Sequence, residues 1–253
     1  MNELEMLKTN LEDKKTVVLN PGHIPEDDRK FIGPETEGGN NKKTVALIKK
    51  YLEEYIVDVK IETQEDGIPF NKIGTTYPNS TLFFSFHTNA FEGGVGKGTE
   101  VFYHYGRTLA QRIAQRTAVL LETKVRGDMG GAKRNSEVYG GAGFSVINKA
   151  VKSGIKYQLM AEIGFHDNPD EVKHIVGKRD LIARAIAEEI ALYLELEKKP
   201  VKEIVTLAPK GKLFQVALGA YKSRENAQEI LEKATLAGLK PYLVIVDDPK
   251  YKK

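Results

Sequence analysis

The fold class is decided by residues 16–61, which read TVVLNPGHIPEDDRKFIGPETEGGNNKKTVALIKKYLEEYIVDVKI. The apolar run at residues 16–19 is typical of a buried strand, and residues 56–61 predict the next strand. Between these runs, apolar side chains recur at the spacing of one helix face, at Val45, Ile48, Leu52 and Tyr55. A strand, a helix and a second strand in this order predict one βαβ unit of a parallel sheet.

The alternation of strands and helices continues to about residue 196. Further runs typical of strands lie at residues 81–86, 99–103 and 156–163. Helical patterns lie at residues 107–122 and 182–193, and residues 168–171 (NPDE) have the features of a helix start. We therefore predict an α/β fold with a mostly parallel twisted sheet flanked by helices.

Residues 123–143 interrupt this alternation. They contain six glycines and several charges, which is more than a connection between two elements requires. We interpret this segment as a loop over a functional site.

The chain changes character after residue 198. Residues 199–212 contain Pro and Lys without a helical period and predict a linker, whereas residues 213–253 predict a small α+β unit in βαβ order. The chain is thus expected to comprise an N-terminal extension (1–15), a main domain (16–198), the linker and this C-terminal unit. A unit of about forty residues without cysteine seldom folds alone, so we expect it to need a partner.

The composition excludes several classes of protein. The 253 residues include no cysteine, which rules out disulfides, thiol nucleophiles and sulfur-based metal sites. No apolar run approaches the ~18 to 20 residues of a membrane span, so membrane insertion is not expected. The N-terminus lacks the apolar core of a secretory signal, and we expect synthesis in the cytoplasm. The net charge of +3 is small and aromatic residues are not interleaved with basic ones, so nucleic-acid binding is not expected.

Three titratable residues stand at the ends of predicted strands. His23 follows the first strand, His87 ends the strand that begins at residue 81, and Glu162 ends the last one. In open α/β sheets, ligands and catalytic groups gather at the carboxyl ends of the strands. We therefore expect these three side chains at one edge of the sheet.

Two imidazoles and one carboxylate form the ligand set of a hydrolytic zinc site with an open position for water. The carboxylate could be Glu37, which lies in a Gly-flanked loop leading into the first helix. An additional glutamate beside the water would then act as general base. Taken singly, however, a histidine at a strand end is more often structural, and the spacing alone leaves both interpretations open.

Five short motifs carry a resemblance to a known family. They are residues 21–23 (PGH), Glu37 with Asn41, residues 86–90 (FHTNA), residues 97–101 (KGTEV), and residues 161–165 (AEIGF) followed by Asn168. In this order and spacing, the chain from about residue 16 to 196 resembles the zinc-dependent N-acetylmuramoyl-L-alanine amidases of the amidase_3 family. That family includes phage endolysins and bacterial sporulation and division amidases.

The resemblance implies Zn²⁺ as cofactor, with His23, Glu37 and His87 as its ligands and Glu162 as the catalytic glutamate. It also implies the substrate, the amide between the lactyl group of N-acetylmuramic acid and L-alanine in peptidoglycan. Glu35 is a rival ligand, but Glu37 is preferred because an Asn four positions later fits the helix start of the family.

The sequence departs from the family pattern after the first histidine. Residues 24–30 (IPEDDRK) are bulky and charged where the family usually has small residues. Three further histidines, His104, His166 and His174, match no functional family position. Of these, His166 is near Glu162 in the sequence and either helps to orient substrate or is structural.

The C-terminal unit resembles the first half of a SPOR domain, which is a peptidoglycan-binding module. The likeness rests on residues 214–216 (FQV), 219–221 (GAY), Ser223, 225–227 (ENA) and 237–238 (AG). Because an unfinished sheet leaves a pairing edge, we expect two chains to supply one half each, which predicts a homodimer with a shared wall-binding unit. Alternatively, the tail or the main domain covers this edge.

The resemblance implies cell-wall lysis after release of the protein, through a holin for a phage endolysin or through mother-cell lysis for a bacterial autolysin. Two other functions remain alternatives. One is a metallopeptidase that cuts within the stem peptide, and the other is a non-catalytic cell-wall-binding protein.

Overall fold

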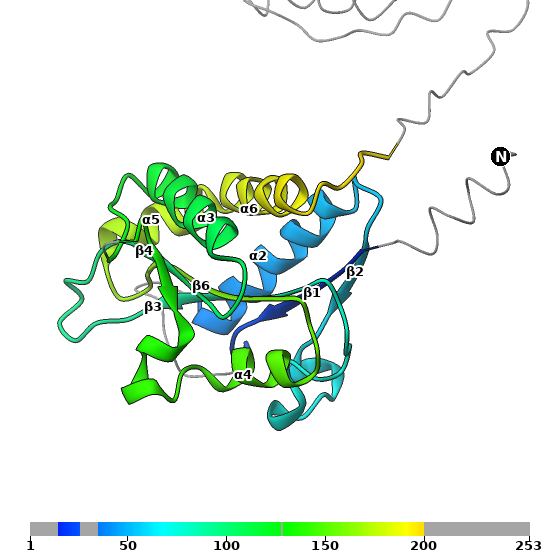
Figure 1. The fold of residues 1–253 in the computed structure, drawn as a ribbon. Helices are drawn as coiled ribbons and strands as arrows, with labels where there is room; N and C mark the ends of the chain where they lie inside the picture. The colour runs from blue at the N-terminus through cyan, green and yellow to red at the C-terminus, as the bar shows by residue number, and fades with distance from the viewer. Residues whose placement is uncertain (1–14, 26–34, 128, 200–253) are drawn as a thin grey trace, which may run out of the picture. The chain divides into compact units, whose positions relative to one another are not determined.

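The computed structural model describes residues 15–25, 35–127 and 129–199 (Figure 1). The predicted C-terminal unit at 213–253 lies outside the described residues. The same holds for the linker, apart from Lys199, and for the N-terminal extension, apart from Lys15. Their predicted roles therefore stay predictions.

Six strands form one sheet in the order β2-β1-β3-β6-β4-β5. Their bounds are β1 Thr16–Pro21, β2 Asp58–Ile61, β3 Leu82–Asn89, β4 Thr99–Tyr103, β5 Ala132–Arg134 and β6 Tyr157–Phe165. Strands β2, β1, β3 and β6 are parallel to one another. Strand β4 is antiparallel to β6, and β5 pairs in parallel with β4. The prediction of an α/β fold with a mostly parallel sheet is confirmed.

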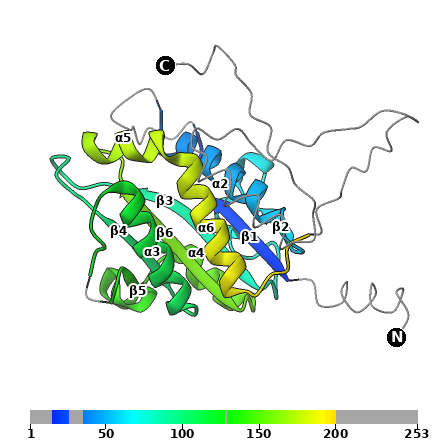
Figure 2. The ribbon, with the colours of Figure 1, turned by 90° about the horizontal axis from the view of Figure 1, so that it is seen from above.

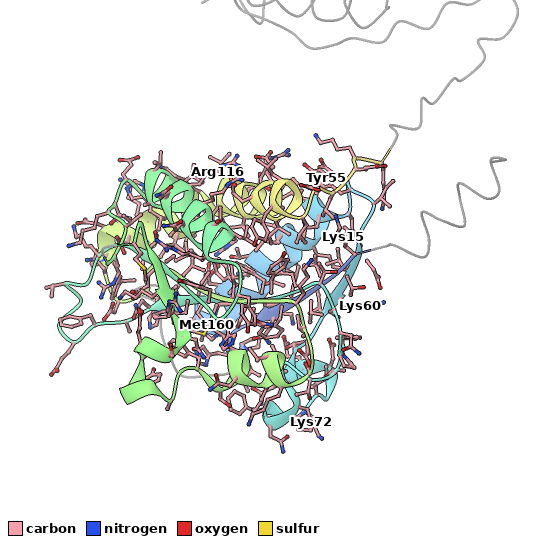
Figure 3. The ribbon with its side chains drawn as sticks, in the orientation of Figure 1. Lys15, Tyr55, Lys60, Lys72, Arg116 and Met160 are labelled. Atoms are coloured by element: carbon pink, nitrogen blue, oxygen red, sulfur yellow. The ribbon has the colours of Figure 1, made fainter. Side chains whose placement is uncertain are left out.

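A layer of helices covers one face of the sheet (Figures 1 and 2). It contains α2 Glu37–Leu52, α3 Arg107–Leu121, α5 Pro169–Gly177 and α6 Arg179–Tyr193. The main hydrophobic core lies between these helices and the sheet, and it includes Val45, Ile48, Leu109, Ile113 and Ile186. At the outer side of this layer, Arg116 of α3 pairs with Glu188 and Glu189 of α6 (Figure 3). None of the helices among the described residues has the length and apolar character needed to cross a membrane.

The opposite face of the sheet packs on the short helix α4, Ser145–Lys152. A smaller core lies there, in which Met160 of β6 joins Phe83, Phe102 and Ile147 (Figure 3). Four 3-10 turns complete the described structure: η1 Gln64–Asp66, η2 Phe70–Lys72, η3 Asn135–Glu137 and η4 Tyr139–Gly141.

Three details differ from the sequence-based predictions. Residues 123–143 are not a simple loop, because residues 132–134 form the edge strand β5. Helix α4 was not expected from the sequence. The first helix ends at Leu52, so Tyr55 is not on it and instead forms an isolated bridge with Lys198. The helix start at Asn168 is confirmed, because its side chain accepts hydrogen bonds from the backbone N–H groups of Asp170 and Glu171.

Candidate metal centre and catalytic glutamate

His23 lies directly beyond the carboxyl end of β1. Its backbone has a φ of +61°, a left-handed conformation that few residues other than glycine adopt. Gly22 makes the approach to β3 possible, because a Cβ at this position would lie 2.1 Å from the ring of His87. The Gly22 N–H also donates to the carbonyl of Phe86 at 2.9 Å. The turn thus holds the two imidazoles against each other, with ring centroids 5.0 Å apart and planes at 90°.

Glu37 is the first residue of α2. Thr36 caps the helix by accepting the N–H of Gly39 at 3.0 Å. A carboxylate is favoured in this first turn by the partial positive charge of the helix N-terminus. Asn41, one turn later, donates to Gly22 O at 2.9 Å and to Glu37 Oε1 at 3.4 Å, so it ties the helix to the turn before His23.

A second glycine allows α2 to meet the segment that follows His23. A Cβ at Gly38 would lie 2.0 Å from the backbone oxygen of Ile24. The hydroxyl of Thr36 also donates to the carbonyl of Pro25 at 2.7 Å. These contacts place the start of the helix, and with it Glu37, beside His23.

His87 is oriented by a chain of hydrogen bonds that runs through β1 to the residue after β2. Its Nε2 lies 3.0 Å from Ser85 Oγ, the Ser85 hydroxyl donates to Asn20 Oδ1 at 2.7 Å, and Asn20 donates to the carbonyl of Glu62 at 2.7 Å. Because the Ser85 proton is used on Asn20, the Ser85 oxygen accepts from Nε2–H. In the neutral ring, His87 Nδ1, which faces Glu37 Oε1, is then the nitrogen that would bind a cation.

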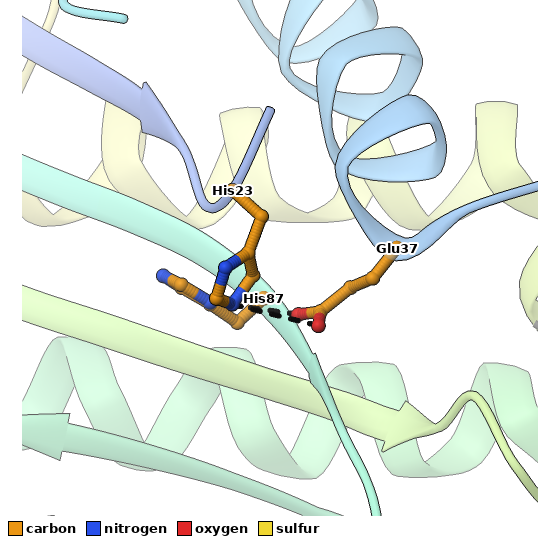
Figure 4. A group of neighbouring side chains, drawn as sticks. All are labelled: His23, Glu37 and His87. Atoms are coloured by element: carbon orange, nitrogen blue, oxygen red, sulfur yellow. Dashed lines mark ion pairs between the residues drawn. The ribbon is translucent and has the colours of Figure 1, made fainter. Parts of the chain in front are cut away.

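The three side chains converge on one point (Figure 4). His23 Nε2 lies 3.5 Å from Glu37 Oε2, and His87 Nδ1 lies 3.5 Å from Glu37 Oε1. One potential ligand atom from each residue lies within 4.8 Å of the others. Two ligands of a tetrahedral zinc ion, each about 2.0–2.1 Å from it, are about 3.3 Å apart. The observed spacing and the nitrogen and oxygen donor set therefore fit Zn²⁺.

Glu37 is 2% exposed, and its electrostatic surroundings favour the ionised form. Burial alone would raise its pKa, but the hydrogen bond and charge of His87, followed by the charges of His23 and His166, lower the pKa of Glu37 to about 2. The backbone N–H of Thr88 also donates to Glu37 Oε1 at 3.2 Å. The residue is therefore held as a carboxylate, the form that binds a cation.

Glu162 lies next to this cluster on β6, in register with His87 of β3. The residue as a whole is partly exposed, but its Oε2 atom is buried and has no hydrogen-bond partner among the described residues. Burial raises the pKa of Glu162 to about 8, and the charges of Glu37 and Glu100 act in the same direction, whereas His87 opposes them. An unpaired buried carboxyl oxygen with a raised pKa fits a proton-transfer group beside a cation.

Other candidate residues lie elsewhere. The carboxylate of Glu35 is engaged by Lys43 at 2.6 Å and by Arg179 at 2.5 Å, so the geometry favours Glu37 over this rival. His104 is exposed and follows β4, whose antiparallel direction places this end at the opposite edge of the sheet from His87. His174 lies on α5, 3.9 Å from Glu122.

His166 is at the site, which the sequence left open. It is 6% exposed, and its Nδ1 lies 3.8 Å from Glu37 Oε2 and 3.2 Å from both the hydroxyl and the carbonyl oxygen of Thr88. The supporting residues Asn20 and Ser85 were not expected from the sequence. The signal that could have identified them is a polar residue directly after an apolar strand run, two or three positions before each candidate histidine.

Fold and site together define a class of protein, an α/β enzyme with a His-Glu-His cluster and a neighbouring glutamate at the carboxyl ends of its parallel strands. Over residues 17–192 the sequence matches the family Amidase_3, described as N-acetylmuramoyl-L-alanine amidase, and the chain belongs to this family. Family membership supports amidase activity on peptidoglycan and thus cell-wall hydrolysis. Among curated proteins, none matches this chain significantly.

Solved structures share the fold. An N-acetylmuramoyl-L-alanine amidase structure from Neisseria meningitidis has a TM-score of 0.58 and 22% sequence identity, covering 73% of this chain and 98% of its own. One from Clostridium difficile 630 has a TM-score of 0.57 and 19% identity, with coverages of 72% and 98%. The CwlD amidase from Clostridioides difficile, solved in complex with the GerS lipoprotein, has a TM-score of 0.55 and 20% identity, with coverages of 72% and 99%.

Proposed function

We propose that this protein is a zinc-dependent amidase that cleaves the bond between the lactyl group of N-acetylmuramic acid and L-alanine in peptidoglycan. The observation that carries the proposal is the convergence of His23, Glu37 and His87, whose potential ligand atoms lie within 4.8 Å of one another. The unpaired Oε2 of Glu162 on the adjacent strand supplies the second requirement, a group that moves a proton.

The ligand residues would have separate tasks. His23 and His87 would supply neutral nitrogen donors, and Glu37, whose pKa is lowered to about 2, would supply a carboxylate at neutral pH. Ser85 and Asn20 would hold the His87 ring in the tautomer whose Nδ1 would bind the cation. When bound at these residues, Zn²⁺ would polarise the scissile carbonyl and lower the pKa of water.

Glu162 would carry the proton. Its Oε2 would accept a proton from the attacking water and later deliver it to the departing alanine nitrogen. A carboxyl group with a pKa raised by burial is suited to both steps, because it binds the proton firmly enough to hold it until the amine leaves. A nearby cation opposes this rise and moves the pKa towards neutrality.

The proposal is tested by product analysis of digested cell walls, with and without a chelator. An amidase leaves intact glycan strands and releases peptides with a new alanine N-terminus, as seen by mass spectrometry. A metallopeptidase would instead cut within the stem peptide, and a non-catalytic wall-binding protein would release nothing. If products appeared unchanged after complete metal removal, the metal-dependent mechanism would be wrong.

Variants separate the roles of the residues. Glu162→Gln is expected to retain one equivalent of metal and lose activity by about 10²- to 10⁴-fold. His87→Ala is expected to lose both metal and activity, because it removes a ligand nitrogen. His104→Ala is the matched control, since that histidine is exposed and lies at the opposite edge of the sheet. Metal content by atomic spectroscopy and turnover are measured on the same preparations.

A further inference from the structure

A cationic cluster lies on the strand next to the candidate catalytic glutamate. Its centre is Glu100 of β4, which is 3% exposed. Glu100 Oε1 accepts hydrogen bonds from Arg126 Nε and Asn89 Nδ2, both at 3.0 Å, and Oε2 pairs with the ammonium group of Lys133. Among the described residues, one carboxylate is therefore shared by two cations, and these three side chains together carry one positive charge in excess.

The register of the sheet places this cluster close to the His-Glu-His site. Glu162 is in register with His87 on one side and with Glu100 on the other, so the three side chains form a row on the same face. Adjacent strands are about 4.8 Å apart, and the backbone of Glu100 is thus about 10 Å from that of His87. The backbones of both cations lie beyond β4 from the imidazoles, since Lys133 belongs to the edge strand β5 and Arg126 follows Val125, which bridges to Thr99 of β4.

Both cations are held in place and still reach solvent. The Arg126 guanidinium lies 4.8 Å from the centroid of the Phe165 ring, and the Lys133 ammonium lies 5.8 Å from that of Phe102. Their side chains are 31% and 32% exposed, whereas the Glu100 side chain beneath them is 4% exposed. Both residues line an open hollow of about 220 Å³, together with Lys124, Val125 and Gly127. Preorganised cations beside a hollow favour binding of an anion.

Neutralising a buried carboxylate would need only one of these cations. The second cation, whose side chain lines the hollow, matches the chemistry of the proposed substrate. Stem peptides carry free carboxylates on residues that follow the alanine. An extended peptide spans about 3.5 Å per residue, so a carboxylate two or three residues from the scissile amide reaches about 7–10 Å. The heads of both cations contact the Glu100 carboxylate, so this reach is comparable with the spacing of about 10 Å between His87 and Glu100.

We propose that Arg126 and Lys133, held by Glu100, form a subsite that binds a free carboxylate of the stem peptide within three residues of the scissile amide. This inference rests on the proposed function, because it assigns the orientation of the peptide at the same site. The peptide would then run across the sheet edge from the His-Glu-His cluster towards β5. Amidation of that carboxylate, which removes its charge, would weaken binding.

The experiment compares three synthetic muramoyl tripeptides with the full-length metal-loaded protein. One has free carboxylates on its second and third residues, and each of the others has one of these carboxylates converted to an amide. For the unmodified protein, amidation at one of the two positions is expected to raise KM by about 3- to 10-fold with little change in kcat, and this difference should shrink at high salt. Equal KM values for all three peptides would overturn the proposal, and this test needs no variant.

Variants then connect the discrimination to the two cations. In Arg126→Gln and in Lys133→Gln, the KM of the acidic peptide is expected to rise towards that of the amide, so that the difference between the peptides is lost. Lys152→Gln is the control, because this exposed lysine at the end of α4 is removed without touching the cluster. If a variant slows cleavage of the acidic and the amidated peptides equally and keeps the ratio of their KM values, the cations have a structural role only and the proposed subsite is wrong.

The two proposals fail in different ways. If the unmodified protein cleaves none of the peptides at the amide of the muramoyl group, the proposed function is wrong. If it cleaves them all with the same KM, the amidase assignment stands and only the carboxylate subsite is wrong. Binding to the inactive Glu162→Gln protein, measured by calorimetry with the same three peptides, gives the preference without relying on turnover.

Discussion

Glu162 should destabilise the metal-free protein at alkaline pH, and replacing it with glutamine should remove this effect. Burial raises the pKa of this carboxyl from an ordinary value near 4.5 to about 8 in the folded chain. A group with a raised folded-state pKa contributes its full stability below the unfolded pKa and loses it as the pH rises through the folded pKa. Between pH 5 and pH 9, the loss corresponds to at most about 4 kcal/mol, and the partial exposure of the residue reduces it to about 2–4 kcal/mol.

The assay is urea denaturation of chelator-treated protein at pH 5 and pH 9, with unmodified protein and Glu162→Gln measured side by side. The difference between the two free energies of unfolding at pH 5 serves as the reference value. At pH 9 the variant should gain about 2–4 kcal/mol relative to the unmodified chain, because glutamine carries no charge to bury. Taking the difference between two proteins cancels the titration of all other groups.

Two further measurements make this test specific. Glu92→Gln makes the same substitution at an exposed side chain and is the matched control. Adding Zn²⁺ should shrink the alkaline gain of Glu162→Gln, because a neighbouring cation stabilises the carboxylate. Curves for Glu162→Gln that stay parallel to those of the unmodified protein from pH 5 to pH 9 would refute the reasoning.

Three other predictions concern the metal ligands and the C-terminal unit. Gly22→Ala should lower zinc affinity at least 10-fold, because the new Cβ would lie 2.1 Å from the His87 ring. Gly177→Ala is the control and should leave zinc affinity unchanged, because its Cβ would meet no atom within 4 Å. Competition with a chromogenic chelator measures both affinities. Ser85→Ala should lower zinc affinity about 10- to 100-fold, since the ring of His87 loses the partner that fixes its tautomer, and unchanged affinity would show that this bond does not orient the ligand. Truncation after Lys199 should weaken sedimentation with cell walls far more than cleavage of soluble muropeptides, and if the C-terminal unit joins two chains, light scattering should show a dimer become a monomer.

Much of the sheet can be predicted because its strands are apolar on both faces. The residues expected at 99–103 form β4 with the same bounds, and the strand expected from residue 81 is β3. By contrast, β5 consists of only Ala-Lys-Arg, which carries no strand pattern. It is a strand because β4 offers a free edge, and residues 132–134 pair with residues 101–103. Such pairing is a tertiary effect that overrides local preference.

The candidate site divides in the same way. His23, His87 and Glu162 could be placed because the carboxyl ends of parallel strands meet at one edge, a rule that needs only the order of strands and helices. Glu37 needed the helix start as well. The proximity of His166 to Glu37 could not be predicted, because it depends on how the chain turns after β6 and on the contact of this ring with Thr88.

The row formed by His87, Glu162 and Glu100 follows from one further step that the sequence does not show. On the face of the sheet that packs on α4, Phe83, Met160 and Phe102 form the apolar core, and the residues two positions further towards the site edge are Ser85, Glu162 and Glu100. In β6 and β4 this change falls at the same register, because Met160 pairs with Phe102 and Glu162 with Glu100, whereas in β3 it comes one pair earlier, at Ser85 beside Met160. Because β4 runs antiparallel, its polar residue precedes its apolar one in the sequence, and no local pattern relates Glu100 to Glu162. Only the pairing of β4 with β6 places Glu100 and its two cations next to Glu162. The charges that surround Glu162 therefore depend on the order of the strands in the sheet.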